Sequence, residues 1–359
     1  MNMELLRIIF TFVIVFYHMR NRIKIFSQGR YAVELFFILS GFFFALTYER
    51  TPTIIDFIKR KIIRFTPLIV FCSLFGVFFR NKASFSALSA DWFFWGNTLF
   101  NGDSYSGAAW YISVLIWITL LFYYLLKTQR KETACTVIAV LTFFAYLACI
   151  RFSNPPLGFG RLQGLGGKEN LGYLIPQSLM RGIGGIGLGF FIALFYSEQD
   201  TKISLFKTWQ YTVAELALLI LPCVSMFYKP MFPDNVMVLI ADFAGLIYLF
   251  AVKKGYVSRF LEKPCFARIS RYCLAIYLSH QTIAFPILDR LKISSFFTSR
   301  PAIAFIYIAS SFIVGFTIYH TVERPIGQAL KKRLMPPTTD NDKNSTQTVP
   351  ANGQLTPDK

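Results

Sequence analysis

The chain has 359 residues, of which 54% are apolar and 18% aromatic, and its mean hydropathy is +0.47. This composition is too apolar for an ordinary soluble domain and indicates a polytopic membrane protein. Lys and Arg number 37 against 19 Asp and Glu, but no stretch is long and polar enough to form a soluble basic module. The basic excess therefore indicates membrane orientation and argues against a nucleic-acid partner.

Ten apolar stretches predict about ten transmembrane helices, and therefore an all-α fold with residues 1–334 as one integral membrane domain. The stretches are 4–19, 31–48, 66–79, 108–126, 133–150, 175–196, 209–228, 235–252, 272–289 and 302–320. The first lacks a basic leading region and a small-residue cleavage site, so we expect a retained helix and not a signal peptide. The aromatic DWFFWGNTLF at 91–100 is either an interfacial or a re-entrant piece.

An even number of helices places both termini on one side of the membrane. The loops that then face the cytoplasm carry more Lys and Arg than the outer loops, as the positive-inside rule requires, although RNRIKIFSQGR at 20–30 violates it. We therefore expect both termini in the cytoplasm. Residues 335–359 lack apolar periodicity and are rich in Thr, Asn, Asp and Pro, which predicts a disordered cytoplasmic tail.

The first apolar stretch keeps two polar residues, Arg7 and His18. They are eleven residues apart, so on a helix both side chains leave the same face, separated by about 16 Å along the axis. Charged groups inside a membrane are costly and usually face a cavity or a partner. The alternatives are an Arg that extends to the lipid headgroups and a His at the interface.

The second stretch carries Glu34 about one turn from its outer end, at a depth similar to that of His18. A carboxylate that accepts a hydrogen bond from one imidazole nitrogen raises the basicity of the other, so this pair would suit a general base. The alternative is that Glu34 pairs with Arg20 or Arg30 at the surface. Ser40 follows in the middle of the same stretch.

A basic cluster, DFIKRKIIRFTP, precedes the third stretch. Lys59, Arg60, Lys61 and Arg64 belong to it, and Arg60 and Arg64 share a face of a short amphipathic helix. Such a cluster suits the phosphates of an anionic cosubstrate, and binding of anionic lipid headgroups is the alternative.

Arg181 and His280 are further polar residues in apolar stretches. The Gly-rich RGIGGIGLGFF that begins at Arg181 lacks the Lys-Ser/Thr ending of a phosphate loop, so we interpret it as a helix-packing surface. The six cysteines form no CxxC pair and no metal-ligand spacing with the three histidines, which predicts free buried thiols and no metal.

Seven short motifs then occur in order, each weak by itself. They are the Arg-x10-His of the first stretch, ELFFILSGF (34–42), RKIIRFTP (60–67), AWYISVL (109–115), RGIGGIGLGFF (181–191), SRYCLAIYLSHQ (270–281) and ERP (323–325). In order and spacing the sequence resembles, over residues 3–327, the membrane-bound acyltransferase-3 proteins, many of which O-acetylate bacterial surface carbohydrates.

The resemblance implies acetyl-CoA as cytoplasmic cosubstrate, a carbohydrate or lipid-linked glycan as acceptor, and a place among the lipids of the bacterial cytoplasmic (inner) membrane. Arg7 and the 59–64 cluster would hold the donor's phosphates. His18 would act as general base with Glu34 orienting it, or else His18 or Ser40 would carry the acyl group covalently. Ser40, Trp110, Arg181 and His280 are the substrate or cavity candidates.

Two other function classes fit the residues without the resemblance. A helix bundle with buried Arg, Glu, Asp and His also suits a proton-coupled transporter or flippase, although the two halves of the chain show no detectable pseudo-symmetry. A scaffold whose polar residues only lock helices together is the second alternative.

Overall fold

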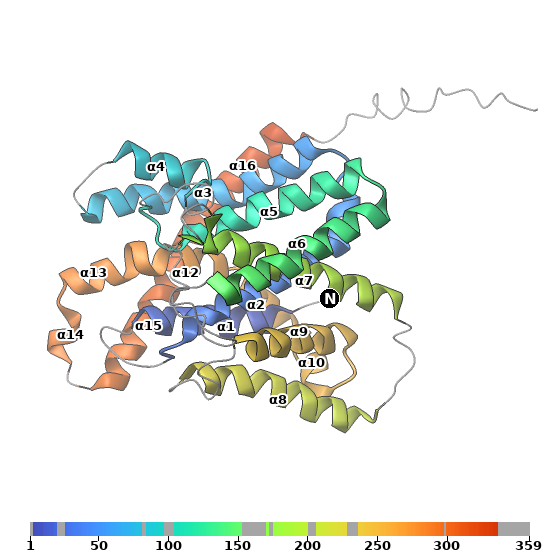
Figure 1. Ribbon diagram of the computed structural model, residues 1–359. Helices are drawn as coiled ribbons and strands as arrows, with labels where there is room; N and C mark the ends of the chain where they lie inside the picture. The colour runs from blue at the N-terminus through green and yellow to red at the C-terminus, as the bar shows by residue number, and fades with distance from the viewer. Residues whose placement is uncertain are drawn as a thin grey trace, which may run out of the picture.

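The computed structural model of the protein is a bundle of α-helices, and most of the long ones lie roughly along one direction (Figure 1). It describes residues 3–19, 26–80, 84–96, 104–152, 170–171, 175–199, 206–227, 236–297 and 299–336. Of the tail expected at 335–359, residues 337–359 lie outside this described part. The helices are α1 (Glu4–His18), α2 (Ala32–Thr47), α3 (Ile54–Arg80), α4 (Phe85–Trp92), α5 (Ala109–Thr128), α6 (Lys131–Phe152), α7 (Gln177–Glu198), α8 (Thr208–Phe227), α9 (Val236–Val252), α10 (Tyr256–Phe260), α11 (Pro264–Ser270), α12 (Cys273–Ser279), α13 (Phe285–Arg290), α14 (Ile293–Phe296), α15 (Arg300–Ile318) and α16 (Arg324–Leu334).

Short elements complete the architecture. Two 3₁₀ turns flank α2, and a pair of two-residue antiparallel strands, β1 (Asn170–Leu171) and β2 (Ile175–Pro176), precedes α7. Each of the ten predicted apolar stretches coincides with helical structure over most of its described residues, although 175–196 begins on β2. Within the described residues, seven helical segments are long and apolar enough to cross a membrane by length and composition, while α1, α9 and the broken α12–α13 segment are shorter.

The third predicted stretch, 66–79, proved too short. α3 begins at Ile54 and continues through Pro67, so the basic cluster belongs to the same helix as the apolar stretch that follows it. Proline removes one backbone hydrogen bond and crowds the carbonyl four residues earlier, here that of Ile63. α16 packs against α3, and Gly327 lies beside the Ile63 carbonyl oxygen.

The outside of the bundle is strongly apolar. α6 and α8 are the least buried of the spanning candidates, and large apolar side chains protrude from several helices. The most exposed include Phe78, Phe143, Phe144, Phe195, Trp209, Phe305 and Ile313. An exposed apolar surface of this extent is typical of helices that face lipid.

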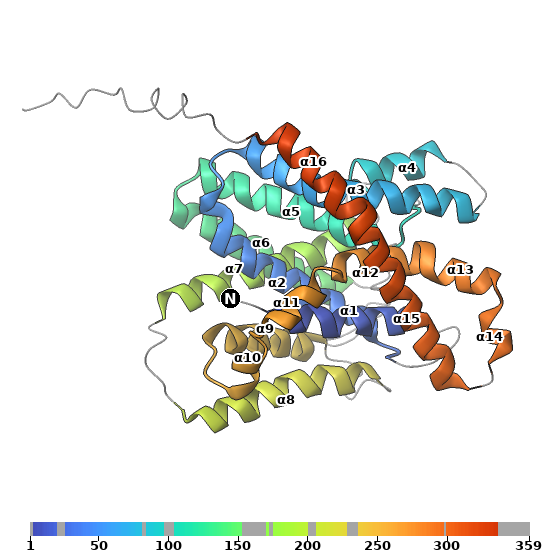
Figure 2. The ribbon, with the colours of Figure 1, turned by 180° about the vertical axis from the view of Figure 1, so that it is seen from behind.

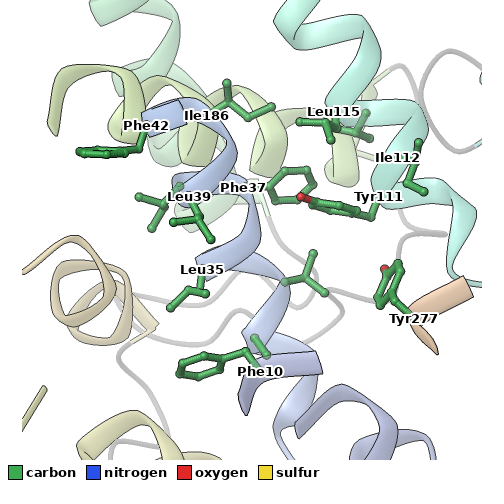
Figure 3. Close-up of a cluster of buried hydrophobic side chains, with 14 of the residues drawn as sticks. Phe10, Leu35, Phe37, Leu39, Phe42, Tyr111, Ile112, Leu115, Ile186 and Tyr277 are labelled. Carbon is green, nitrogen blue, oxygen red and sulfur yellow. The ribbon is translucent and has the colours of Figure 1, made fainter. Parts of the chain in front are cut away.

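α2 and α7 form the most closely packed helix pair. A Cβ on Gly41 would lie 1.9 Å from the Ile186 carbonyl oxygen, and a Cβ on Gly189 would lie 1.8 Å from that of Ile38. Only glycine permits such an approach of two backbones. This confirms the interpretation of the Gly-rich sequence as a packing surface. Around the pair, side chains of α1, α2, α5 and α7 build the apolar core shown in Figure 3.

Two helical segments contain a π-helical turn just before a proline. The turns are His280–Ala284, between α12 and α13, and Tyr319–Glu323, between α15 and α16; Figure 2 shows α15 running on into α16. In each case the next helix has proline at its second position, Pro286 or Pro325. Because a proline cannot donate the usual backbone bond, the wider turn accommodates it without ending the helix.

Two buried carboxylates anchor loops. Glu215 of α8 accepts backbone N–H bonds from Gly255 (3.2 Å) and Ser258 (3.1 Å), at the start of α10. Asp91 of α4 accepts bonds from the Ser104 hydroxyl (2.5 Å) and from the next two backbone N–H groups. Burial raises the pKa of Asp91 to about 6, against the lowering effect of these hydrogen bonds. Both carboxylates are hydrogen-bonded within the protein, so their burial is explained without a bound ligand.

Candidate active site

Arg7 lies at the mouth of a cavity of about 760 Å³. It sits in the first half of α1, where its guanidinium is 3.2 Å from the carboxylate of Glu4 and stacks 4.9 Å from the ring centre of Phe43. Glu4 in turn accepts a hydrogen bond from Ser270 of α11. Arg7 is therefore held at the cavity by contacts to α2 and α11, and it remains partly exposed.

The lining of the cavity is basic toward this end. Five basic and two acidic side chains line it: Arg7, Lys61, Arg64, Arg271 and Arg324, with Glu4 and Glu323. They come from α1, α3, the α11–α12 junction and the α15–α16 junction, four parts of the chain that the fold brings together. An excess of positive charge in a cavity of this size favours an anionic ligand, and the volume is within the usual range for small-molecule sites.

The predicted basic cluster divides between two faces of α3. Lys61 and Arg64 line the cavity together with Phe57 and Phe65, at the three- and four-residue spacing of one helix face. Lys59 and Arg60 do not line it. The expectation that Arg60 and Arg64 act together was therefore wrong: the partner of Arg64 in the cavity is Lys61, three residues earlier.

Three aromatic side chains meet at the deep end of the cavity. The rings of Phe36, Tyr111 and Tyr277 lie with centres 5.9 to 6.5 Å apart, and we call this group the aromatic triangle. The Tyr111 hydroxyl donates to the Phe36 carbonyl (3.1 Å) and lies 3.0 Å from the hydroxyl of Ser40. Ser40 thus lines the cavity, as predicted for a cavity candidate, and its hydroxyl is engaged by Tyr111.

His18 lies beyond the aromatic triangle, and its partner is His280. The Nδ1 atom of His18 is 2.8 Å from Nε2 of His280, which is fully buried at the start of the first π-helical turn. The ring of Tyr277, one helical turn earlier on α12, lies 6.2 Å from the ring of His280. The two histidines therefore adjoin the deep end of the cavity through Tyr277, although neither lines it.

Among the described residues, the partner of Glu34 is Arg181 and not His18 or Arg30. Its Oε1 atom accepts a bond from Nε of Arg181 at 2.5 Å, and both side chains are almost completely buried between α2 and α7. The expected Glu34–His18 contact is wrong because the tight packing of α2 on α7 turns this face of α2 toward Arg181. Trp110 completes the group, with the Arg181 guanidinium stacked 5.2 Å from its ring centre.

A comparison with protein families decides the class of the protein. The family model described as an acyltransferase domain, acyltransferase-3, matches residues 2–320. The chain belongs to the acyltransferase-3 family. It is accordingly an integral membrane acyltransferase. Comparisons with curated proteins and with solved structures gave no match.

The region matched to acyltransferase-3 contains the aromatic triangle, both histidines and most of the cavity. Sequence reasoning missed several residues of the site: the cavity-lining Arg271, Glu323 and Arg324, and the role of Tyr277. Lys61 belonged to the predicted basic cluster, and a three-residue helical spacing could have paired it with Arg64. The others lie within the motifs SRYCLAIYLSHQ and ERP, but only the folded bundle shows that they reach the cavity.

Proposed function

We propose that this acyltransferase transfers an acetyl group from acetyl-CoA, bound in the basic cavity, to a hydroxyl of a carbohydrate or lipid-linked glycan at the His18 end of the bundle. The observation that carries this proposal is the position of the cavity. It opens among basic side chains at the Arg7 end and runs along α1 toward the histidine pair.

The donor fits the chemistry of the lining. Acetyl-CoA carries phosphate groups at one end and a neutral thioester at the other, and the lining changes in the same order. Arg7, Lys61 and Arg64 offer charged donors near the mouth, whereas the deep end is formed by aromatic rings and hydroxyls. Guanidinium groups bind phosphate oxygens with strong, charge-assisted hydrogen bonds.

The distances indicate how far the acetyl group must travel. Tyr277 lines the cavity, and His280 follows it by three residues, about 4.5 Å along a helix axis. His18 is in hydrogen-bond contact with His280. The acetyl end of the donor therefore reaches His18 once the side chains of the aromatic triangle move aside, without any rearrangement of helices.

The imidazole of His18 serves as general base. It takes the proton of the acceptor hydroxyl while the hydroxyl oxygen attacks the thioester carbonyl carbon and forms the new C–O bond. The carbonyl then re-forms, the C–S bond breaks, and the thiolate of coenzyme A leaves with the proton that the His18 imidazolium returns. His18 ends the cycle neutral.

The orientation follows from the basic residues. The end that carries Arg7, α16 and its cluster Lys331, Lys332 and Arg333 faces the cytoplasm, where acetyl-CoA is made. The His18 end then faces outward, in the bacterial inner membrane, where glycan acceptors are accessible.

The test compares His18→Ala with His320→Gln. His18→Ala should abolish acetyl transfer from labelled acetyl-CoA and remove acetyl groups from the cell's surface glycans, as read by mass spectrometry, while the protein still inserts into the membrane. His320 does not line the cavity, so His320→Gln should retain activity. Substantial transfer by His18→Ala would refute His18 as the base, and unchanged glycans in a strain lacking the gene would refute the acceptor class.

A further inference from the structure

The two histidines of the site form a hydrogen bond whose direction the surrounding backbone determines. His18 Nδ1 and His280 Nε2 are 2.8 Å apart, and a neutral imidazole has one donor nitrogen and one acceptor nitrogen. Distance alone does not say which of the two facing atoms carries the hydrogen. The other nitrogen of His280 supplies that information.

His280 Nδ1 lies 3.1 Å from the backbone carbonyl oxygen of Ile276. A carbonyl oxygen only accepts, so this nitrogen must carry the hydrogen and donate it. His280 is fully buried, with the ring of Phe285 edge-on at 5.5 Å, and a second proton on its ring would place a charge in an apolar setting. Its Nε2 is therefore the acceptor.

It follows that His18 donates from Nδ1, and that its lone pair is on Nε2. This is the less common tautomer of a histidine side chain in water, so the protein must impose it. We propose that His280 is a positioning residue: its Nε2 accepts from Nδ1–H of His18 and thereby keeps Nε2 of His18 as the basic atom. The proposal rests on the function proposed above, in which His18 is the base.

The same contact stabilises His18 after it takes a proton. The imidazolium then donates from Nδ1 to a neutral acceptor, and such charge-assisted bonds are stronger than neutral ones. The proton does not move on to His280, because His280 would then hold protons on both nitrogens in a buried site. The positive charge therefore stays on His18 until the proton is returned to the leaving thiolate.

The chain allows a direct spectroscopic test because it contains three histidines. In a His320→Gln variant labelled with ¹⁵N-histidine, His18 and His280 supply all imidazole signals of the chain. Solid-state NMR in bilayers at neutral pH should show both rings as neutral and protonated on Nδ1. A signal from a ring protonated on Nε2, or on both nitrogens, would overturn the proposal. This readout needs no activity and no assignment of the two rings.

A kinetic test separates positioning from packing. Glutamine at 280 can place its amide oxygen near the former Nε2 and accept the same bond, whereas leucine cannot accept. His280→Leu should lower kcat by about 10- to 100-fold, part of the typical contribution of acid–base catalysis, with the KM for acetyl-CoA nearly unchanged. His280→Gln should recover most of that loss.

The outcomes distinguish this inference from the proposed function. If His18→Ala is inactive but His280→Leu and His280→Gln are equally active or equally impaired, the positioning role of His280 is wrong and the base remains. If His18→Ala is active, the proposed function itself fails. Should His280→Leu fail to fold, the NMR result on the His320→Gln protein decides alone.

Discussion

Removing one member of the buried Glu34–Arg181 ion pair should destabilise the protein more than removing both. The pair joins α2 to α7, and the two side chains are 1% and 3% exposed. At 2.5 Å between Nε and Oε1, and with an effective dielectric constant of about 20, their attraction is about 7 kcal/mol. Desolvation offsets part of it, and removing one partner from such a pair costs about 3–5 kcal/mol because a charge is left buried.

The perturbation is therefore a cycle of Glu34→Met, Arg181→Met and the double variant. Each single variant should lower the midpoint of thermal unfolding in detergent by roughly 6–10 °C, measured as the loss of the monodisperse peak in size-exclusion chromatography after heating. The double variant should recover most of the loss, since a methionine pair of similar volume fits an apolar setting. Losses that simply add would contradict the reasoning. If Glu34→Met kept its stability but lost all activity, Glu34 would instead take part in the catalysed reaction.

Three further outcomes follow from the structure. Arg64→Ala should raise the KM for acetyl-CoA by about 10-fold, the loss of one charge-assisted phosphate contact, while Arg60→Ala, from the other side of α3, should leave it unchanged in the same radiometric assay. Gly189→Ala should prevent the close approach of α2 and α7 and lower the free energy of unfolding by more than about 1–3 kcal/mol. Gly327→Ala is the control, since the nearest atom lies 3.6 Å from the new Cβ, and it should leave stability unchanged. Thermal unfolding of the two variants measures the difference. Burial raises the pKa of Asp91 from 3.8 to about 6, so the folded state binds the proton of this carboxyl more tightly than the unfolded state does. The contribution of Asp91 to the free energy of unfolding is therefore complete below about pH 4 and is lost as the pH rises through 6. In Asp91→Asn, the unfolding midpoint should decrease less between pH 4 and pH 7 than in the parent protein. An equally large decrease in the variant would show that Asp91 is not the group responsible.

The positions of the helices could be predicted because a membrane requires long apolar stretches, and each predicted stretch is helical over most of its described residues. The boundary of α3 could not, because the basic cluster interrupts the apolar pattern before residue 66, whereas the helix begins at Ile54 and continues through Pro67. The orientation of the chain remains a prediction from the charge distribution.

Within the site, helical periodicity correctly predicted which residues share one helix. It could not predict contacts between residues on different helices. Arg7 and His18 share α1, with Arg7 at the cavity and His18 near its deep end, as their spacing suggested. The partner of His18 is 262 residues away in sequence, and no local pattern points to it. Glu34 was assigned to His18 on depth alone, but depth leaves the direction around the helix axis undetermined, and the packing on α7 set that direction.

The aromatic triangle also affects how the two sides of the membrane stay separated in a protein that contains a deep cavity. A hydrocarbon layer of about 30 Å normally separates the two aqueous phases, but here a water-accessible cavity extends from one side as far as Phe36, Tyr111 and Tyr277. One layer of rings thus lies between the cavity and the histidine pair, His18 and His280. Side-chain motions are in general faster than the collective motions of packed helices, which take on the order of microseconds to milliseconds. Under the proposed function, Phe36, Tyr111 and Tyr277 would therefore set how large an acyl group reaches His18.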